Sequence, residues 1–263
     1  MKKLTFVAAA ALALVFASCG NKTQQAEETQ DSVAFEQSQI EAKVMVELDS
    51  IADEWNKLAP VEGVFANGKI VLSEDELKAK PEYLLDLASI DNLTLLSQKY
   101  RALGVIAVDS KVAELYKMDV EPYQAAIAKI AADVNDPAVG SKDNAETPEA
   151  IKAMYIAEKE NGRINLFWEQ AAAAVVEQLY VMSQNADKFL PAFDDKAASD
   201  LTYHVALLKL SLDDLATYDD NIKKLVELLA PLNEFNAISV DQLKEQLAAA
   251  KTQIEAARAE LLK

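Results

Sequence analysis

The sequence has one cysteine and one histidine, Cys19 and His204, and this scarcity excludes several kinds of site. A single cysteine forms no disulfide within the chain, and a zinc site built from cysteine and histidine lacks its ligands. Covalent haem attachment is excluded for the same reason, and a hydrolytic triad would depend on His204 alone. No two glycines lie closer than Gly63 and Gly68, which excludes a glycine-rich phosphate loop.

Glycine and basic residues are also scarce. Six glycines in 263 residues, together with abundant alanine, favour long helices, because alanine loses the least free energy on entering a helix and glycine loses much more. The 43 acidic residues exceed the 26 basic ones, which gives a formal net charge of −17. Phosphate backbones and anionic lipid headgroups repel such a chain, so we expect no nucleic-acid partner and no basic membrane-binding face.

The N-terminal region has the features of a secretion signal. Lys2 and Lys3 precede an apolar run over residues 4–17, which is shorter than the ~20 residues that a membrane-spanning helix requires. The run ends in FASCG at residues 16–20 and resembles the lipobox of bacterial lipoproteins. The resemblance implies a signal peptide over residues 1–18 and a lipid attached to Cys19. The alternative is an ordinary signal peptide followed by an incidental cysteine.

The resemblance to Gram-negative lipoproteins also implies a location. Gly20 stands where an aspartate is often linked to retention in the inner membrane, so we expect the outer membrane. Residues 20–25 (GNKTQQ) lack the acidic run that sends some lipoproteins to the cell surface, which favours the periplasmic face. Residues 20–31 contain no large apolar side chain, and we interpret 19–31 as a flexible tether that reaches ~20 Å.

The remainder of the chain, residues 32–263, has the periodicity of helices. Apolar residues recur at steps of three and four, first at Ile40, Val44, Leu48, Ile51, Trp55 and Leu58, and last at Leu243, Leu247, Ala250, Ile254, Ala257 and Leu261. Capping signals begin helices at Ser73, Thr147 and Ser239. The sequence therefore predicts an all-α fold, a multi-helix bundle of about eight helices with short loops.

The sequence leaves the pairing of the helices and the nature of two connecting segments undetermined. Similar apolar stripes would let the first and last helices pair antiparallel. Residues 103–108 are apolar on every face and predict a buried helix centre, while the alanines at 171–174 would admit a close neighbour. Residues 60–72 predict a surface loop, with a small hairpin as the alternative. The segment 135–147 either separates sub-bundles 32–134 and 148–263 or, as we favour, is a loop within one domain.

Two groups of residues are candidates for a site. Aromatic residues gather in one part of the sequence and could line an apolar pocket: Phe167, Trp168, Tyr180, Phe189, Phe193 and Tyr203. We take Trp168, Tyr203 and His204 as the candidate ligand-binding residues, with packing in the core as the alternative. Asp200 precedes His204 by one helical turn and is the nearest acid that could orient it.

The acids suggest neither a metal site nor a catalytic pair. Acidic residues are adjacent at 194–195, 213–214 and 219–220, without the alternate spacing of a calcium loop, and the helix dipole accounts for them at helix starts. We therefore expect no metal and no cofactor.

These observations predict a non-catalytic binding or scaffold module of the cell envelope, with a protein of the envelope as its partner. One alternative is a carrier of a small apolar ligand in an aromatic-lined cavity of the bundle. The other is an enzyme that acts on glycans through carboxylates alone.

Overall fold

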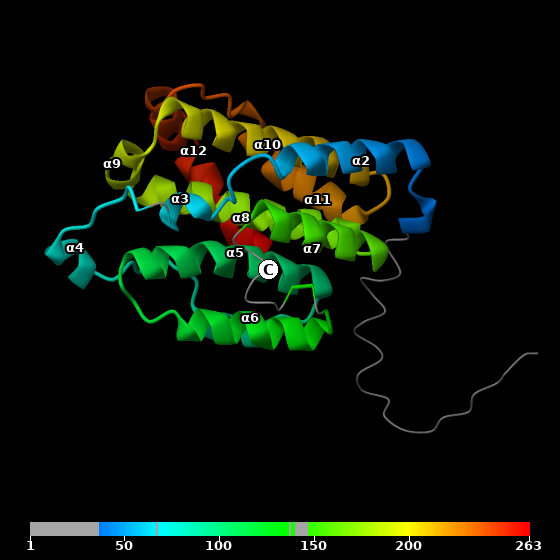
Figure 1. Ribbon diagram of the computed structural model, residues 1–263, viewed down its shortest axis with the longest axis horizontal. Helices are drawn as coiled ribbons and strands as arrows, with labels where there is room; N and C mark the ends of the chain where they lie inside the picture. The colour runs from blue at the N-terminus through cyan, green and yellow to red at the C-terminus, as the bar shows by residue number, and fades with distance from the viewer. Residues whose placement is uncertain (1–36, 67, 137, 140–146) are drawn as a thin grey trace, which may run out of the picture.

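The computed structural model describes residues 37–66, 68–136, 138–139 and 147–263. Within these ranges it contains helices and no strand, which confirms the all-α fold (Figure 1). The helices of ten residues or more are α2 (Ala42–Trp55), α5 (Leu96–Leu115), α6 (Glu121–Val134), α7 (Pro148–Glu160), α8 (Ile164–Gln184), α10 (Asp195–Leu215), α11 (Asp220–Leu229) and α12 (Val240–Leu261). Shorter ones are α3 (Gly63–Ala66), α4 (Glu74–Lys78) and α9 (Ala186–Phe189). The signal peptide, the tether and Cys19 lie outside the described residues.

Local sequence signals begin the helices at the predicted places. The hydroxyl of Ser73 accepts a hydrogen bond from the backbone N–H of Glu76, whose carboxylate accepts from Ser73 in return. Thr147 caps α7 and Ser239 caps α12 by accepting from backbone N–H groups of the first turn. Residues 60–72, which were predicted as a loop, contain the short helix α3, and no strand supports a hairpin among the residues described there.

α5 and α8 cross with their backbones almost in contact. A Cβ atom added to Gly104 would lie 2.2 Å from the carbonyl oxygen of Gln170 and 2.9 Å from the nitrogen of Ala174. Only glycine allows this approach, and the alanines at 171–174 supply the small facing surface that the sequence predicted. The centre of α5 is buried, so that prediction is also confirmed.

The two helices run parallel. Arg101 of α5 pairs with Glu169 of α8, and two turns further along Asp109 lies against Glu177. α6 returns antiparallel along α5, and α7 then leads into α8. α8 is the central helix, because α5, α7, α10 and α12 all pack on it.

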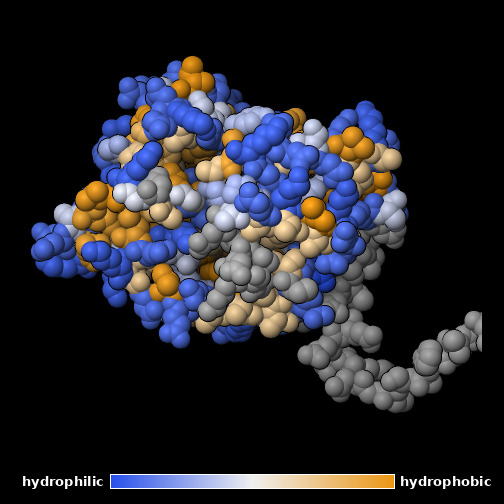
Figure 2. Space-filling view, viewed as in Figure 1, coloured by the Kyte–Doolittle hydropathy of each residue, from blue (hydrophilic) through white to orange (hydrophobic). Residues whose placement is uncertain are grey.

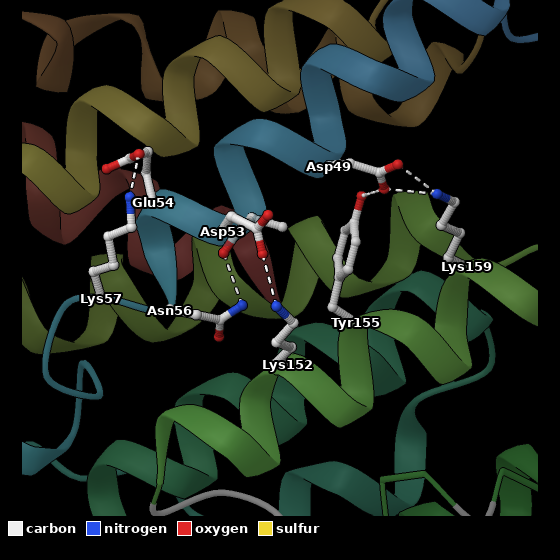
Figure 3. A network of polar contacts seen from close by, with 9 residues as sticks. Asp49, Asp53, Glu54, Asn56, Lys57, Lys152, Tyr155 and Lys159 are labelled. Atoms are coloured by element: carbon white, nitrogen blue, oxygen red, sulfur yellow. Dashed lines mark hydrogen bonds and ion pairs between the residues drawn. The ribbon is translucent and has the colours of Figure 1, made fainter.

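The first and last long helices do not form the pair that their stripes allowed. α2 packs antiparallel on α10 and touches α7, whereas α12 packs antiparallel along α8. Figure 3 shows the α2–α7 contact, in which Asp49 accepts hydrogen bonds from Tyr155 and Lys159, and Asp53 pairs with Lys152 at 2.9 Å. Similar stripes specify that both helices bury one face, but not which partner covers it.

The largest hydrophobic core surrounds α8 and draws buried residues from both sides of the 135–147 segment, such as Trp55 and Val108 before it and Trp168 and Leu247 after it. A second, smaller core fills the space between α5 and α6. On the face drawn in Figure 2, hydrophilic residues predominate and hydrophobic ones form small separate groups. None of the helices in the described ranges has the length and apolar character needed to cross a bilayer.

Candidate functional site

Trp168 lies at the centre of the aromatic packing between α2, α7 and α8. Its side chain is fully buried, with ring centroids 5.7 Å from Trp55, 5.1 Å from Phe167 and 6.3 Å from Tyr155. The interplanar angles are 67–88°, which is the edge-to-face arrangement that aromatic quadrupoles favour. These rings fill the junction of three helices and position α2 against α8.

His204 joins this aromatic group, but Tyr203 does not. The His204 ring centroid lies 4.5 Å from that of Trp55, and its side chain is 4% exposed. Burial lowers the pKa of His204 to about 4, although the nearby Asp200 carboxylate opposes the shift, so the imidazole is neutral at pH 7. Tyr203 is 41% exposed on another face of α10. Of the three candidates, Trp168 and His204 thus both pack on Trp55, and Tyr203 lies apart from them.

The other aromatic residues of the candidate pocket lie elsewhere. Phe189 packs edge to face on Phe65, with centroids 5.5 Å apart, and Tyr180 packs on Tyr83. A small apolar cavity of about 20 Å³ lies between α8, α10 and α11, lined by residues such as Val175. That volume is about one water molecule's probe sphere, so it offers no space for an organic ligand.

A different set of polar residues surrounds α8. The sequence contains only three arginines against 23 lysines, and each arginine pairs with a carboxylate whose side chain is 0% exposed. The pairs are Arg101–Glu169 at 2.6 Å, Arg163–Asp136 at 3.1 Å and Arg258–Glu177 at 2.9 Å. Lysines pair with acids on the surface such as Asp53 and Asp187, which are 60% and 89% exposed.

One of these arginines faces two buried acids. Arg258 of α12 donates to both carboxylate oxygens of Glu177 and lies 4.7 Å above the ring of Tyr180. Asp109 of α5, also fully buried, accepts a hydrogen bond from the backbone N–H of Leu85. Burial raises the pKa of Asp109 well above its usual range, and the charge of Glu177 adds to the shift. Asp109 is therefore the protonated member of the pair, and Glu177 is the ionised partner of Arg258.

A second buried acid pair, Asp136 and Glu158, lies where the α6–α7 connection meets the start of α8. The Tyr100 hydroxyl donates to Asp136 at 2.6 Å, and Arg163 donates to the same oxygen at 3.1 Å. Burial opposes the ionisation of Asp136, but these donors and the N–H of Ala138 hold its pKa below the ordinary value. Glu158 has no such donors at short range, and burial together with the Asp136 charge raises its pKa to about 8.

The candidate binding site is a surface groove of about 620 Å³, which we name the α9–α12 groove. It is lined by Glu76, Ser183, Gln184, Asn185, Ala186, Asp187, Lys188, Lys244, Leu247, Ala248 and Lys251. These residues come from α4, the end of α8, α9 and one face of α12, so four segments converge there. The volume lies within the range of ligand sites in proteins, roughly 300–1,000 Å³.

The groove combines both signs of charge with an apolar floor. Lys244 pairs with Asp187 at 2.6 Å, Lys188 pairs with Glu76, and Lys251 donates to the last-turn carbonyl oxygen of Ser183. The pairing with Lys244 lowers the pKa of Asp187. Leu247 is buried beneath them. Ammonium, carboxylate and amide groups beside an apolar surface suit a ligand that carries both donors and acceptors, such as a polypeptide segment.

Within the described ranges, no group of three or more histidine, cysteine, aspartate or glutamate side chains is arranged to hold a metal ion. Two of the acidic pairs lie at helix starts, where Asp194 caps α10 and Asp219 caps α11 by accepting from backbone N–H groups. The pair at 213–214 lies in the last turn of α10, where the helix dipole does not favour acids, so the expectation of a helix start is wrong there.

Sequence reasoning singled out Trp168 and His204, which the structure buries among other rings, and it missed the buried acids and the groove. One signal for the acids was present in the sequence, because arginine is preferred over lysine in buried ion pairs and only three arginines occur. The groove gave no signal, since its residues come from four segments that only the tertiary structure brings together. Comparisons of the chain with protein families, with characterised proteins and with solved structures find no match.

Proposed function

We propose that this chain is a lipid-anchored, non-catalytic binding module of the bacterial cell envelope. The lipid is attached to Cys19, the helical bundle stands on the periplasmic side of an outer membrane, and the α9–α12 groove binds a segment of an envelope protein. The observation that supports the binding role is this groove, where paired charges, amide groups and an apolar floor lie together on the surface.

The groove has the chemistry of a polar interface. Peptide N–H and C=O groups can exchange hydrogen bonds with Gln184 and Asn185, and the Lys244–Asp187 pair is accessible enough to pair with charges on a partner. Electrostatic complementarity of this kind orients a partner more than it raises affinity. The carrier of an apolar ligand has no comparable support, because Trp168 is enclosed by other rings.

The test is cross-linking of the full-length protein in the cells that produce it, followed by capture and identification of the partners. Ala248→Trp on α12 places a large side chain in the groove, and we expect it to abolish the cross-links. Ala249→Trp is the matched control, since Ala249 is the next residue, is equally exposed and does not line the groove. Cross-links that persist in Ala248→Trp would contradict the proposed binding face.

The same cells test the anchor. The wild-type protein should incorporate an alkyne-labelled fatty acid and sediment with outer membranes, and Cys19→Ala should do neither. A wild-type protein that stays unlabelled, or a purified protein that turns over a glycan, would contradict the lipid-anchored or the non-catalytic part of the proposal.

A further inference from the structure

The chain between α3 and α4 contains a stretch with the character of a strand, residues 69–73, which we name the 69–73 segment. It has no helix, turn or bend, and Figure 1 draws it as a plain trace. Ile70 is buried and Leu72 is half-buried against the main core, while the three other side chains are exposed. This alternation with a period of two is typical of an extended chain that packs one face on a core.

The backbone groups of this segment are available to another chain. Among the hydrogen bonds in the described part of the protein, none involves the N–H or C=O groups of Ile70, Val71 or Leu72. Val71 also has the highest exposed fraction of the described large hydrophobic residues, 80%. Unpaired N–H and C=O groups beside an exposed β-branched side chain are a template for strand pairing.

The segment has one open edge. In an extended chain, the N–H and C=O groups of one residue point to the same edge, and neighbouring residues point to opposite edges. Ser73 lies on the same edge as Val71, and its N–H donates to the carboxylate of Glu76 in the same chain at 2.7 Å. The other edge presents the groups of Ile70 and Leu72, so a second strand has two residues there with which to exchange hydrogen bonds.

The charges beside the segment complement those of a second copy. Lys69 begins the segment, and two exposed acids, Glu74 and Asp75, follow its end. In an antiparallel pair of two copies, the start of each segment lies beside the end of the other, which places Lys69 diagonally opposite Asp75 of the second copy. Lys69 already pairs with Asp194 at 3.8 Å, but both side chains are more than half exposed, so a second acid can approach the ammonium group. A parallel pair would bring like charges together instead.

We propose that two copies of this chain form a dimer in which their 69–73 segments pair as an antiparallel, two-stranded ribbon about a two-fold axis. Ile70 of each copy exchanges N–H···O=C hydrogen bonds with Leu72 of the other copy. Val71 then lies opposite Val71 of the second copy at a non-hydrogen-bonded position, where opposing side chains are closest and a β-branched pair is favourable. The pairing uses neither the lipid anchor nor the α9–α12 groove, so it is independent of the proposed function.

The pairing is short, so the association is weak and depends on concentration. An isolated two-stranded ribbon is marginal in water. Here each strand already packs on a folded core, which lowers the entropic cost of ordering it on binding. We therefore expect a dissociation constant between about 10 and about 300 μM.

The test is hydrogen exchange of the full-length protein at about 10 μM and about 1 mM. The backbone amides of Ile70 and Leu72 should gain about threefold or more in protection at the higher concentration, because both donate across the ribbon. The amide of Val71 points to the other edge and should not change. Protection that is the same at both concentrations, or that rises equally at all three amides, would overturn the proposal.

Variants separate the ribbon from other forms of association. Val71→Lys places two ammonium groups opposite each other, and it should weaken the dimer by about tenfold or more in sedimentation equilibrium. Val46→Lys is the matched control, since Val46 of α2 is 67% exposed and lies outside the segment, and it should dimerise as the wild type does. A Val71→Lys protein with the dissociation constant of the wild type would contradict the ribbon.

A charge reversal tests whether the occupant is a second copy. Lys69→Asp should weaken the dimer, and Lys69→Asp combined with Asp75→Lys should restore it, because opposite charges again face each other across the two copies. A double variant as weak as Lys69→Asp would contradict the antiparallel pairing. A wild type that stays monomeric, with Ile70 and Leu72 protected only when a partner protein is added, would assign the open edge to a foreign strand and overturn the dimer.

Discussion

Each of the three arginines, Arg101, Arg163 and Arg258, pairs with a buried carboxylate. Lysines such as Lys152 and Lys244 pair with exposed carboxylates on the surface. The planar guanidinium is less strongly hydrated than an ammonium group, and it can donate two parallel hydrogen bonds to one carboxylate. Its burial therefore costs less free energy than the burial of an ammonium group. In a chain with a large excess of acids, these three residues supply the positive charge beside three buried carboxylates. Asp109 and Glu158, which share an arginine with another acid, are buried in the neutral form.

His204 is the opposite case, a buried base whose nearby acid, Asp200, offsets only part of the cost of burying a positive charge. Its pKa is about 4 in the folded protein and 6.5 as the ordinary value, so the unfolded chain binds the proton more tightly between those limits. The free energy of unfolding should therefore fall as the pH drops from 7 to 4.5, by about 2–3 kcal/mol from this residue.

Urea unfolding of the wild type and of His204→Phe at both pH values checks this expectation. Phenylalanine keeps an aromatic ring on Trp55 and removes the titrating group, so the variant should lose less stability at pH 4.5 than the wild type. Tyr203→Phe, at the exposed neighbour, should lose as much as the wild type. Equal losses in the wild type and His204→Phe would contradict the buried, neutral imidazole.

At the scale of the helices, several starts follow from residues within one turn, whereas each packing partner depends on the whole fold. Ser73, Thr147 and Ser239 satisfy backbone N–H groups through their own side chains, so their helices could be predicted from local sequence. The partners of α2 and α12 could not. Their apolar stripes fit many helices, and the pairing with each other that the stripes allowed is not the one that the structure contains.

The α5–α8 crossing gives a sharp prediction at this scale. Gly104→Ala places a methyl group 2.2 Å from a backbone oxygen of α8, so the helices must separate. We expect the free energy of unfolding to fall by about 3 kcal/mol or more, at or beyond the upper end of typical overpacking. Gly63→Ala is the matched control in α3, because its added carbon would meet nothing closer than 3.8 Å.

Urea unfolding at neutral pH measures both variants. Gly63→Ala should match the wild type or gain up to about 1 kcal/mol, since alanine restricts the unfolded chain more than glycine does. Gly104→Ala with wild-type stability would show that α5 and α8 do not approach as closely as the structure indicates.

At the scale of the whole molecule, the main hydrophobic core contains residues from both sides of the 135–147 segment. α5 comes before the 135–147 segment and α8 after it, yet these two helices make the closest crossing in the core. Trp55 and Trp168, from the two halves, lie with their rings 5.7 Å apart. Sub-bundles 32–134 and 148–263 would each expose a large apolar face if they separated.

We therefore expect one cooperative unfolding transition. Tryptophan fluorescence reports the junction of α2 and α8, and far-ultraviolet circular dichroism reports all helices, so the two urea transitions should coincide. Two separate midpoints would instead favour the alternative of two sub-bundles on either side of residues 135–147.

The sequence by itself determined the helical class, the places where helices start, the buried centre of α5 and the small residues at its crossing, because period, caps and side-chain size act locally. It also supplies the lipobox-like segment at Cys19 on which the anchoring proposal depends. Only the tertiary structure decided which helices pair, that His204 is buried while Tyr203 is not, and that acids from distant segments share one arginine. Those outcomes depend on distances between residues far apart in the chain, and local periodicity contains no information about them.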